Sequence, residues 1–447
     1  MSDSIDEIGS SLEESALGVL DLGVAKGADR VKCVMSAGVE SRLVVENGDF
    51  SIANTTQSHA LGVGVHSRGR KGSASTNSLD QAGIEHAVEE AMALASFSLP
   101  DGNLVMADTA QAVSGKPLSF LYSQDVAGLD LAGIGGLMAQ AVERFNAESR
   151  FALDRFEVSS NVSYHGMVNS LGVRQSERQT TLGWSYLGMA RSGDQVSGMD
   201  YQGGFSFNLN GIAEKMLGDI DVFLARVLGC LNPIKCPAFK GPIVIAPRAL
   251  SQLLISPLLY HASGRSVMDG KSRWSKSVGQ QVVSDKLTVS DEPHSGELIG
   301  STSYDSDGLP TKRFALFQQG VLGEHLQDLY SAKKLGVAPT GTAGGPFGLC
   351  VAAGNTSFEE MVNSSPKVLY VTRFSGNLDS LTGDFSGLAK SSRLYVAGED
   401  KGPVGETMIA GNVFDMANNI ISVGKCVENV GGSYIAPSVM VDGVTVS

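Results

Sequence analysis

The sequence has few of the residues that build metal centres and disulfide frameworks. Its 447 residues include five cysteines and seven histidines. The cysteines are odd in number, scattered and never arranged as Cys-x-x-Cys, so we expect neither a zinc ribbon nor a disulfide framework. We interpret them as small, buried apolar residues. No two histidines stand at the spacing of metal ligands.

Long apolar runs are missing as well. No stretch approaches the roughly 18 apolar residues of a membrane-spanning helix. The N-terminus is acidic from Asp3 to Glu7, where a signal peptide would be basic and then apolar. We therefore expect a cytoplasmic protein with no membrane partner.

Basic charge is scarce. The formal net charge is −13, and a field of this sign repels nucleic acid at long range. One basic cluster, Arg68-Gly69-Arg70-Lys71, lies between two predicted strands, and a solvated hairpin tip explains it better than a nucleic-acid patch. No nucleic-acid partner is expected.

Glycine and apolar residues are abundant. There are 54 glycines, and 42% of the residues are hydrophobic, which predicts a folded, sheet-rich chain of two to three domains. Residues 5–28 have helical spacing, with Leu12, Ala16, Leu20 and Val24 on one stripe. The other predicted elements of this region are strands at 31–35, 41–46 and 60–66, a hairpin turn at 46–49, and helices from Asn77 or Ser78 to 96 and at 129–146.

The pattern changes to long alternating stretches between residues 156 and 207. This indicates an antiparallel hairpin layer with its turn at 169–172, and we expect one polar face of Arg174, Ser176, Arg178 and Thr180. A helix is predicted at 212–228, and three prolines then interrupt regular structure between residues 230 and 242. We place a domain boundary there, which divides the chain into residues 1–230 and 231–447.

The second half opens with a strand at 243–246 and an apolar helix at 247–261. Tyr330 and Lys334 match a dehydrogenase-like spacing, but the cofactor-binding glycine turn is missing, so residues 324–335 are interpreted as a solvent-facing helix with His325 on its surface. The glycine-rich run 339–348 lacks the Lys-Ser/Thr pair of a phosphate loop. It favours a backbone that a peptide can approach closely.

Three blocks of the sequence resemble the PmbA/TldD family in their order and spacing: 62–76, 304–345 and 381–424. The last block reads Leu-Thr-Gly-Asp-Phe-Ser from Leu381 and Gly-Pro-Val-Gly-Glu-Thr-Met from Gly402. The resemblance extends over about residues 28–446 and points to the PmbA (TldE) branch. It implies an α+β, two-domain fold of mostly antiparallel sheets with packed helices, and a link to peptide processing by metallopeptidases.

The resemblance also locates the metal-binding helix of the family's catalytic branch, which carries His-Glu-x-x-x-His. The two histidines would fall near Ile255 and Tyr260, the glutamate near Ser256, and a ligand cysteine near Gly431-Gly432. None of these side chains offers the donors or the base that zinc catalysis needs. We therefore expect no catalytic residue, no metal and no cofactor in this chain.

The candidate peptide-cleft residues are Tyr260, His261, Thr340, Gly341, Gly344 and Gly345, because the comparable glycine loop of the family lines an interior cleft. One alternative metal site is left open, made from His261, Cys426 and His294.

The resemblance implies a non-catalytic half of a two-subunit peptidase that acts on unfolded peptides. A TldD-like partner would supply zinc or iron, and the two subunits would enclose a chamber. The first alternative is a homodimeric peptide-binding or regulatory protein without proteolytic activity, in line with the family label "modulator of DNA gyrase". The second is an autonomous peptidase with an unfamiliar site. On the sequence alone, the non-catalytic peptidase subunit and the homodimeric binding protein both stay open.

Overall fold

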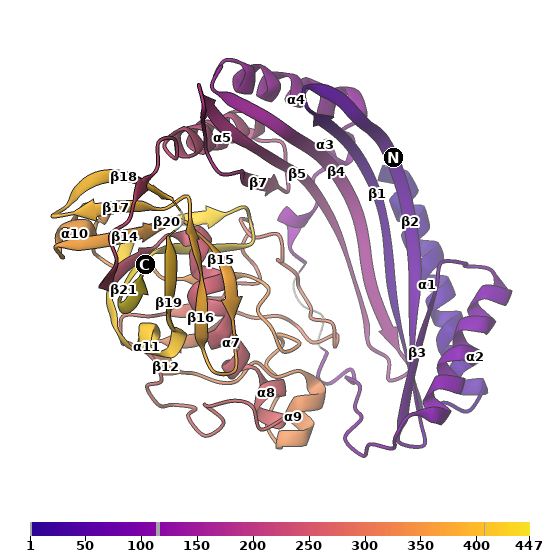
Figure 1. Cartoon of the computed structure of the whole chain (residues 1–447). Coiled ribbons are helices and arrows are strands. Elements are labelled where there is room, and N and C mark those ends of the chain that lie inside the picture. The colour runs from indigo at the N-terminus through magenta and orange to yellow at the C-terminus, as the bar shows by residue number, and fades with distance from the viewer. Residues whose placement is uncertain (1, 113–116, 406) are drawn as a thin grey trace.

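The computed structural model describes every residue except 1, 113–116 and 406. Glu406, within the 381–424 block, therefore lies outside the described residues. The predicted α+β class is confirmed, because two mostly antiparallel sheets carry helices packed against them (Figure 1). In Figure 1 the long strands of the first sheet arch beside the second half of the chain.

The first sheet has seven strands in the described ranges, in the order β3-β2-β1-β4-β5-β6, with β7 also paired to β5. Their bounds are β1 Arg30–Glu46, β2 Asp49–Ser67, β3 Arg70–Thr76, β4 Phe151–Asn169, β5 Arg174–Ser192, β6 Gln195–Val196 and β7 Asp200–Ser206. The prediction of separate strands at 31–35 and 41–46 is wrong, because β1 runs unbroken for 17 residues. Pairing with β2 on one side and β4 on the other keeps the intervening small residues extended.

The tight turns of this sheet form where the sequence predicts them. Asn47 and Gly48 join β1 to β2 with φ values of 51° and 90°, and Arg68 and Gly69 join β2 to β3 with 51° and 72°. Two successive left-handed residues make the turn whose twist matches an antiparallel hairpin. The basic cluster at 68–71 is therefore a hairpin tip, as expected.

Helices cover one face of this sheet, and the other face is polar. The helices are α1 Ser2–Ala25, α2 Gln81–Phe97, η1 Ser119–Leu121, α3 Gln124–Ala127, α4 Leu131–Asn146 and α5 Ile212–Leu228. Val31, Cys33 and Met35 of β1 point into the core beneath α1 and α2. Their neighbours Lys32 and Ser36 lie on the opposite face.

Three details of this half differ from the prediction. Val24 is 50% exposed, whereas Leu20, about one turn earlier on the predicted stripe, is buried. Helix α2 begins at Gln81 because the side chain of Asp80, instead of Asn77 or Ser78, accepts the N–H of Gly83 at 2.7 Å. Thr180, predicted on a polar face, is fully buried. Its hydroxyl tolerates burial because it accepts a hydrogen bond from Ser123 N and donates one to Phe207 O.

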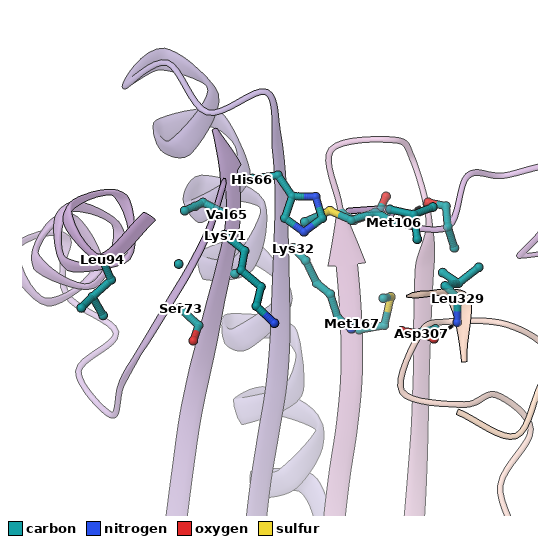
Figure 2. Close-up of a pocket in the computed structure, with 15 residues that line it drawn as sticks. Lys32, Val65, His66, Lys71, Ser73, Leu94, Met106, Met167, Asp307 and Leu329 are labelled. Carbon is teal, nitrogen blue, oxygen red and sulfur yellow. Dashed lines mark hydrogen bonds between the residues drawn. The ribbon is translucent and has the colours of Figure 1, made fainter. Parts of the chain in front are cut away.

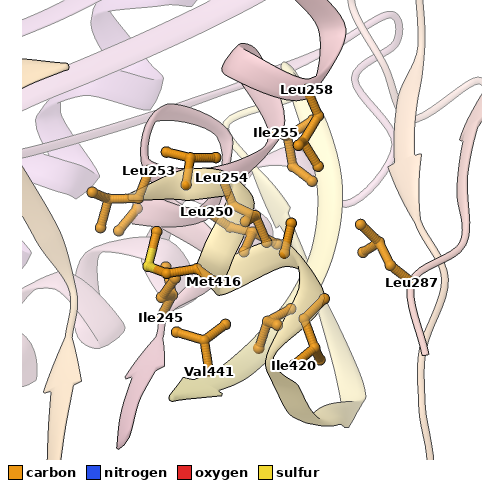
Figure 3. Packing of buried hydrophobic residues seen from close by; sticks show 14 of the residues in the cluster. Ile245, Leu250, Leu253, Leu254, Ile255, Leu258, Leu287, Met416, Ile420 and Val441 are labelled. Carbon is orange, nitrogen blue, oxygen red and sulfur yellow. The ribbon is translucent and has the colours of Figure 1, made fainter. Parts of the chain in front are cut away.

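The second sheet contains 14 strands in the described part of the chain. They are β8 Ile234–Lys235, β9 Phe239–Ile245, β10 Val289–Asp291, β11 Phe314–Gln318, β12 Val321–Leu322, β13 Leu349–Val351, β14 Lys367–Val371, β15 Arg373–Leu378, β16 Asp384–Lys390, β17 Arg393–Val396, β18 Glu399–Gly405, β19 Met408–Asn412, β20 Ile420–Val430 and β21 Tyr434–Val446. Its helices are α6 Pro247–Leu250, η2 Ser251–Ile255, α7 Ser256–Ala262, α8 Gly264–Met268, α9 Leu329–Leu335, α10 Phe358–Asn363 and α11 Val413–Asn418. The central strands β9 and β21 pack against the segment from α6 to α7 (Figure 3).

The single helix predicted at 247–261 is interrupted. A five-residue π-helical segment, η2, separates α6 from α7. Pro257 lies at the start of α7 and has no N–H to donate to the preceding turn. A local widening of the helix at this point accommodates the missing donor.

A buried carboxylate joins the two halves. Asp200 of β7 has a side chain that is 2% exposed and contacts three guanidinium groups. Arg226 of α5 lies 3.0 Å away, Arg248 of α6 3.3 Å and Arg373 of β15 2.8 Å. Burial alone would raise the pKa of Asp200, but the three arginines together lower it. Because two of them belong to the second half, this cluster fixes β7 against α6 and β15.

A second contact reinforces this docking. The loop that begins at Ile299 lies on the polar face of β4 and β5. Glu177 of β5 accepts hydrogen bonds from the backbone N–H of Ser303 at 2.9 Å and from its hydroxyl at 2.7 Å. Gln179 donates to Ile299 O at 3.2 Å.

Substitution Asp200→Asn should lower the free energy of unfolding by about 3 kcal/mol at pH 7, because three buried arginines then lack their counter-charge. The folded-state pKa of Asp200 is depressed, so its stabilisation is present above its ordinary value of 3.8 and is lost as the pH falls through the folded-state pKa. The difference between wild type and variant should therefore shrink below about pH 4. Urea unfolding at several pH values measures it.

Asp221→Asn is the matched control, since Asp221 pairs with Arg144 on the surface, where both side chains are about half exposed. It should leave the unfolding midpoint nearly unchanged. Equal effects of the two substitutions would contradict a special role of Asp200.

Candidate functional site

A cavity of about 1160 Å³ lies at the junction of the two halves. Its walls come from β4 and β5, from β7 and α5, and from the β20–β21 turn together with the loop near Gly296. Both faces of the sheet beside β7 contribute, with Ser185 on one face and Tyr186 on the other. The cavity therefore extends around the outer edge of β7.

The edge of β7 that lies in this cavity has no partner strand among the described residues, because β7 pairs only with β5. Tyr201 to Ser206 of β7 all line the cavity. Two carbonyls of this edge are already engaged, because Tyr201 O accepts from Arg248 Nη2 and Phe205 O accepts from Lys215 Nζ. The remaining backbone donors and acceptors of an unpaired strand edge can pair with an extended chain. The arrangement suits a polypeptide bound in extended form.

Glycines allow the β20–β21 turn to enter the junction. Gly431 and Gly432 have φ values of 60° and 79°, a conformation that side chains rarely adopt. A Cβ on Gly432 would lie 1.9 Å from the ring of Phe205 in β7. The turn is held in place because Ile299 N donates to Gly432 O at 2.9 Å and Gly432 N donates to Asn429 Oδ1 at 2.7 Å.

The lining combines aromatic rings with charges of both signs. Lys215 and Arg248 face the cavity together with Asp219 and Glu428. Burial raises the pKa of both carboxyl groups, and Lys215 near Asp219 opposes the shift, as do Arg226 and Arg248 near Glu428. The hydroxyl of Tyr186 is buried at this wall and has no hydrogen-bond partner among the described residues. A lining of this kind binds backbone and mixed side chains without selecting one charge.

The predicted metal-ligand positions do not form a donor set. Ile255 is 1% exposed and packs in the core with Leu254 and Leu258 (Figure 3). Ser256 is exposed and Tyr260 is partly exposed. Gly431 and Gly432, at the position of the third ligand, line the junction cavity without side chains. An alkyl chain and a phenol do not replace imidazole donors, and glycine offers no thiolate. The hydroxyl of Ser256 does not replace the carboxylate of a general base.

His261 of α7 is a core residue. It is 1% exposed, and its ring packs against Trp274 and Phe414. Its Nδ1 accepts the N–H of Arg273 at 3.1 Å, and its Nε2 lies 3.2 Å from Leu381 O, which only accepts. The geometry assigns the neutral tautomer with the proton on Nε2. Burial lowers the pKa of His261, in line with this form, and neither ring nitrogen is left for a metal.

The alternative site from His261, Cys426 and His294 does not assemble. His294 Nε2 is 2.9 Å from Thr311 Oγ1, and Cys426 is exposed on β20. Within the described ranges, no group of three or more histidine, cysteine, aspartate or glutamate side chains could hold a metal ion.

The six predicted cleft residues lie around one corner of the second half. Leu326 pairs with Ser263 at the end of α7, and the following Gln327 donates its N–H to Thr340 Oγ1 at 2.9 Å. Thr340, Gly341 and His261 are buried. Tyr260, Gly344 and Gly345 are partly exposed, so only these three present surface to a peptide. Peptide contact by the six residues stays a prediction.

The glycine-rich loop leads from this corner to the junction cavity. Its end packs so closely on Gly300 that a Cβ there would lie 2.2 Å from Phe347 O, and the adjacent Ile299 lines the cavity. None of the cavity residues on β5 and β7 was among the predicted cleft residues. The available signal was the pair of glycine doublets, 203–204 and 431–432, because each permits a close backbone approach.

Two further expectations need correction. His325 does not lie on a helix surface, because α9 begins at Leu329 and His325 is buried with Nε2 3.1 Å from Trp274 O. Among the cysteines, Cys33 and Cys236 are buried as expected, but Cys426 is exposed. In the part of the chain that the structure describes, no helix combines the length and apolar character needed to cross a membrane.

The purified chain should contain far less than one transition metal ion per molecule. The resemblance predicts the ligand histidines at Ile255 and Tyr260 and the glutamate at Ser256, and both ring nitrogens of His261 are hydrogen-bonded. Elemental analysis by plasma mass spectrometry measures the ratio. His261→Ala and His86→Ala, a substitution of an exposed histidine, should give the same low value. A ratio near one that His261→Ala abolishes would show a metal site in this chain.

Family models and individual relatives both match this chain to the same family. Residues 33–95 match the PmbA/TldA metallopeptidase domain 1, and residues 239–447 match the PmbA/TldA metallopeptidase C-terminal domain. The metalloprotease PmbA of Escherichia coli O157:H7 is 29% identical over 443 residues, which cover 97% of this chain and 96% of that protein.

Solved structures share the whole fold. TldE from Thermococcus kodakarensis superposes with a TM-score of 0.85 at 19% identity, covering 97% of this chain and all of that one. A candidate modulator of DNA gyrase from Thermotoga maritima also has a TM-score of 0.85, at 22% identity and the same coverage. With two family domains that together span more than half of its length, the chain belongs to the PmbA/TldD family.

Proposed function

We propose that this chain is a PmbA/TldE-like component of a TldD/TldE-type metallopeptidase that processes or degrades unfolded peptides, and that it is itself non-catalytic. It binds peptide in the junction cavity and leaves the bond cleavage to a TldD-like subunit. Zinc or iron is expected only in that subunit.

One observation carries the non-catalytic assignment. The helix that holds the metal ligands in the family's catalytic branch has Ile255 in the hydrophobic core and His261 with both ring nitrogens hydrogen-bonded. A metal-activated water needs at least three ligands and a nearby base. Supplying them here would require rebuilding the core around α7.

The junction cavity supports peptide binding. Its volume of about 1160 Å³ holds a segment of several residues, and the unpaired edge of β7 lies along it. Backbone pairing with a strand edge is largely independent of side-chain identity. A peptide that pairs with β7 must be extended, which favours unfolded chains over folded ones.

The alternative is a homodimeric peptide-binding or regulatory protein with no proteolytic activity. The solved relative named as a candidate modulator of DNA gyrase favours this reading. Both functions use the same cavity and differ in the partner, a TldD-like subunit or a second copy of this chain.

Cleavage of an unstructured peptide should occur in a mixture of this chain with a TldD-like subunit from the same genome, and a chelator should abolish it. This chain alone should cleave nothing. Ser185→Phe adds a ring at the cavity wall and should slow cleavage by the mixture about tenfold, equal to about 1.4 kcal/mol. Gel or mass-spectrometric analysis of the peptide over time measures the rate.

Gln57→Phe is the control, since Gln57 is exposed on the opposite face of the same sheet and does not line the cavity. It should cleave at the wild-type rate. Chelator-sensitive cleavage by this chain alone would show that it is catalytic. A mixture no faster than the TldD-like subunit alone would favour the alternative, and light scattering would then show whether the chain is a homodimer.

A further inference from the structure

Figure 2 shows a second cavity, of about 450 Å³. It lies at the end of the long sheet where β1 begins, whereas the junction cavity lies where β4 begins. One side is formed by β1, β2 and β3. The other is formed by residues 105–107, by Asp307 and by Leu329 at the start of α9. Neither the predicted cleft residues nor the junction cavity shares a lining residue with it.

Strand register places basic side chains together on the cavity side of this sheet. Arg30 of β1 is opposite His66 of β2, which is opposite Lys71 of β3. Lys32 lies two residues beyond Arg30 on the same face, and its partner on β2 is Gly64. Because Gly64 has no side chain, space remains between Lys32 and Lys71 above the strand.

One carboxylate, that of Asp307, also lines this cavity, where it accepts the N–H of Leu329 at 2.9 Å. Lys32 donates to the backbone oxygen of Ser306, and neither Lys32 nor Lys71 forms an ion pair with a carboxylate among the described residues. Burial and the neighbouring Arg30, Lys71 and Lys32 lower the pKa of His66 to about 4, with only Asp29 acting in the opposite sense. The surroundings of His66 are therefore electropositive.

Apolar side chains face these cations. Met106, Met167 and Leu329 are buried and line the cavity (Figure 2). Met106 and Leu329 lie across from the strands, and Met167 lies on β4, beside β1. A free inorganic anion would contact the lysines but would leave this apolar surface unused. A ligand with a carboxylate at one end and an alkyl group beside it matches both sides.

We propose that this cavity binds the C-terminal end of a peptide, with the terminal carboxylate at Lys32 and Lys71 and an apolar last side chain against Met106, Met167 and Leu329. The cavity by itself supports a ligand with a carboxylate and an apolar group. That this ligand is a peptide rests on the proposed function. Peptide-bond hydrolysis creates new C-terminal carboxylates, so the site would hold a product of the partner's reaction.

Calorimetric titration with N-acetyl-alanyl-leucine and with its C-terminal amide tests the proposal. The acid should bind at least tenfold more tightly than the amide, because only the acid makes charge-assisted hydrogen bonds to ammonium groups. Lys71→Gln should weaken binding of the acid about tenfold. Lys276→Gln, the same change at an exposed position outside the cavity, should leave it unaltered.

Gly64→Val provides a second variant. A Cβ at Gly64 meets only Lys32 O, at 3.9 Å, so a branched side chain fits the strand but fills the cavity. It should abolish binding while the circular dichroism spectrum is retained. The proton NMR titration of His66, assigned with His66→Gln, should show its pKa rising when the acid is bound, since an anion favours the imidazolium.

Equal binding of acid and amide, or unchanged affinity in Lys71→Gln, would overturn the proposal. No partner subunit and no cleavage step enter this assay. A negative binding result therefore does not contradict the proposed function. A negative cleavage result with the mixture likewise does not affect the interpretation of the binding assay.

Discussion

The contact of Asp200 with Arg226, Arg248 and Arg373 sets the position of the curved sheet on the second half of the chain. A carboxylate that is almost fully buried beside three guanidinium groups tolerates little displacement, because each lost contact leaves a desolvated charge. The junction cavity depends on this constraint. The same contacts fix β7 at one wall, and the nearby β20–β21 turn completes the enclosure.

Apolar packing and hydrogen bonds hold the segment from α6 to α7, which the resemblance aligns with the metal-binding helix of the family's catalytic branch. Leu250, Leu253, Leu254, Ile255 and Leu258 pack against β9 and β21, so its position depends on apolar burial. His261 adds two hydrogen bonds and two aromatic contacts on the other side. These interactions hold α7 in place whether or not a metal is bound nearby.

Local signals in the sequence predicted local structure well. Asn47-Gly48 and Arg68-Gly69 each specify a left-handed two-residue turn, and the helix at Ile212–Leu228 follows from apolar spacing alone. Non-local effects were not predictable in this way. The continuity of β1 depends on partners far away in sequence, and the burial of His325 depends on Trp274, 51 residues earlier.

The candidate site shows the same division. That Ile255 and Tyr260 carry no metal-donor imidazole follows from the sequence, because donor atoms are a property of each residue type. The junction cavity could not be predicted from the sequence, because β5 and β7 meet the β20–β21 turn only when the two halves dock. Glycine doublets at 203–204 and 431–432 marked close backbone approach without showing that they approach each other.

Photo-crosslinking of an unstructured peptide to the isolated chain, read by mass spectrometry, tests most directly whether a peptide lies intact in the junction cavity. The account predicts crosslinks to β7 and to the β20–β21 turn, at residues such as Tyr201, Phe205 and Asn429, with the peptide recovered at full length. Crosslinks confined to other surfaces, or recovery of peptide fragments that a chelator prevents, would contradict it.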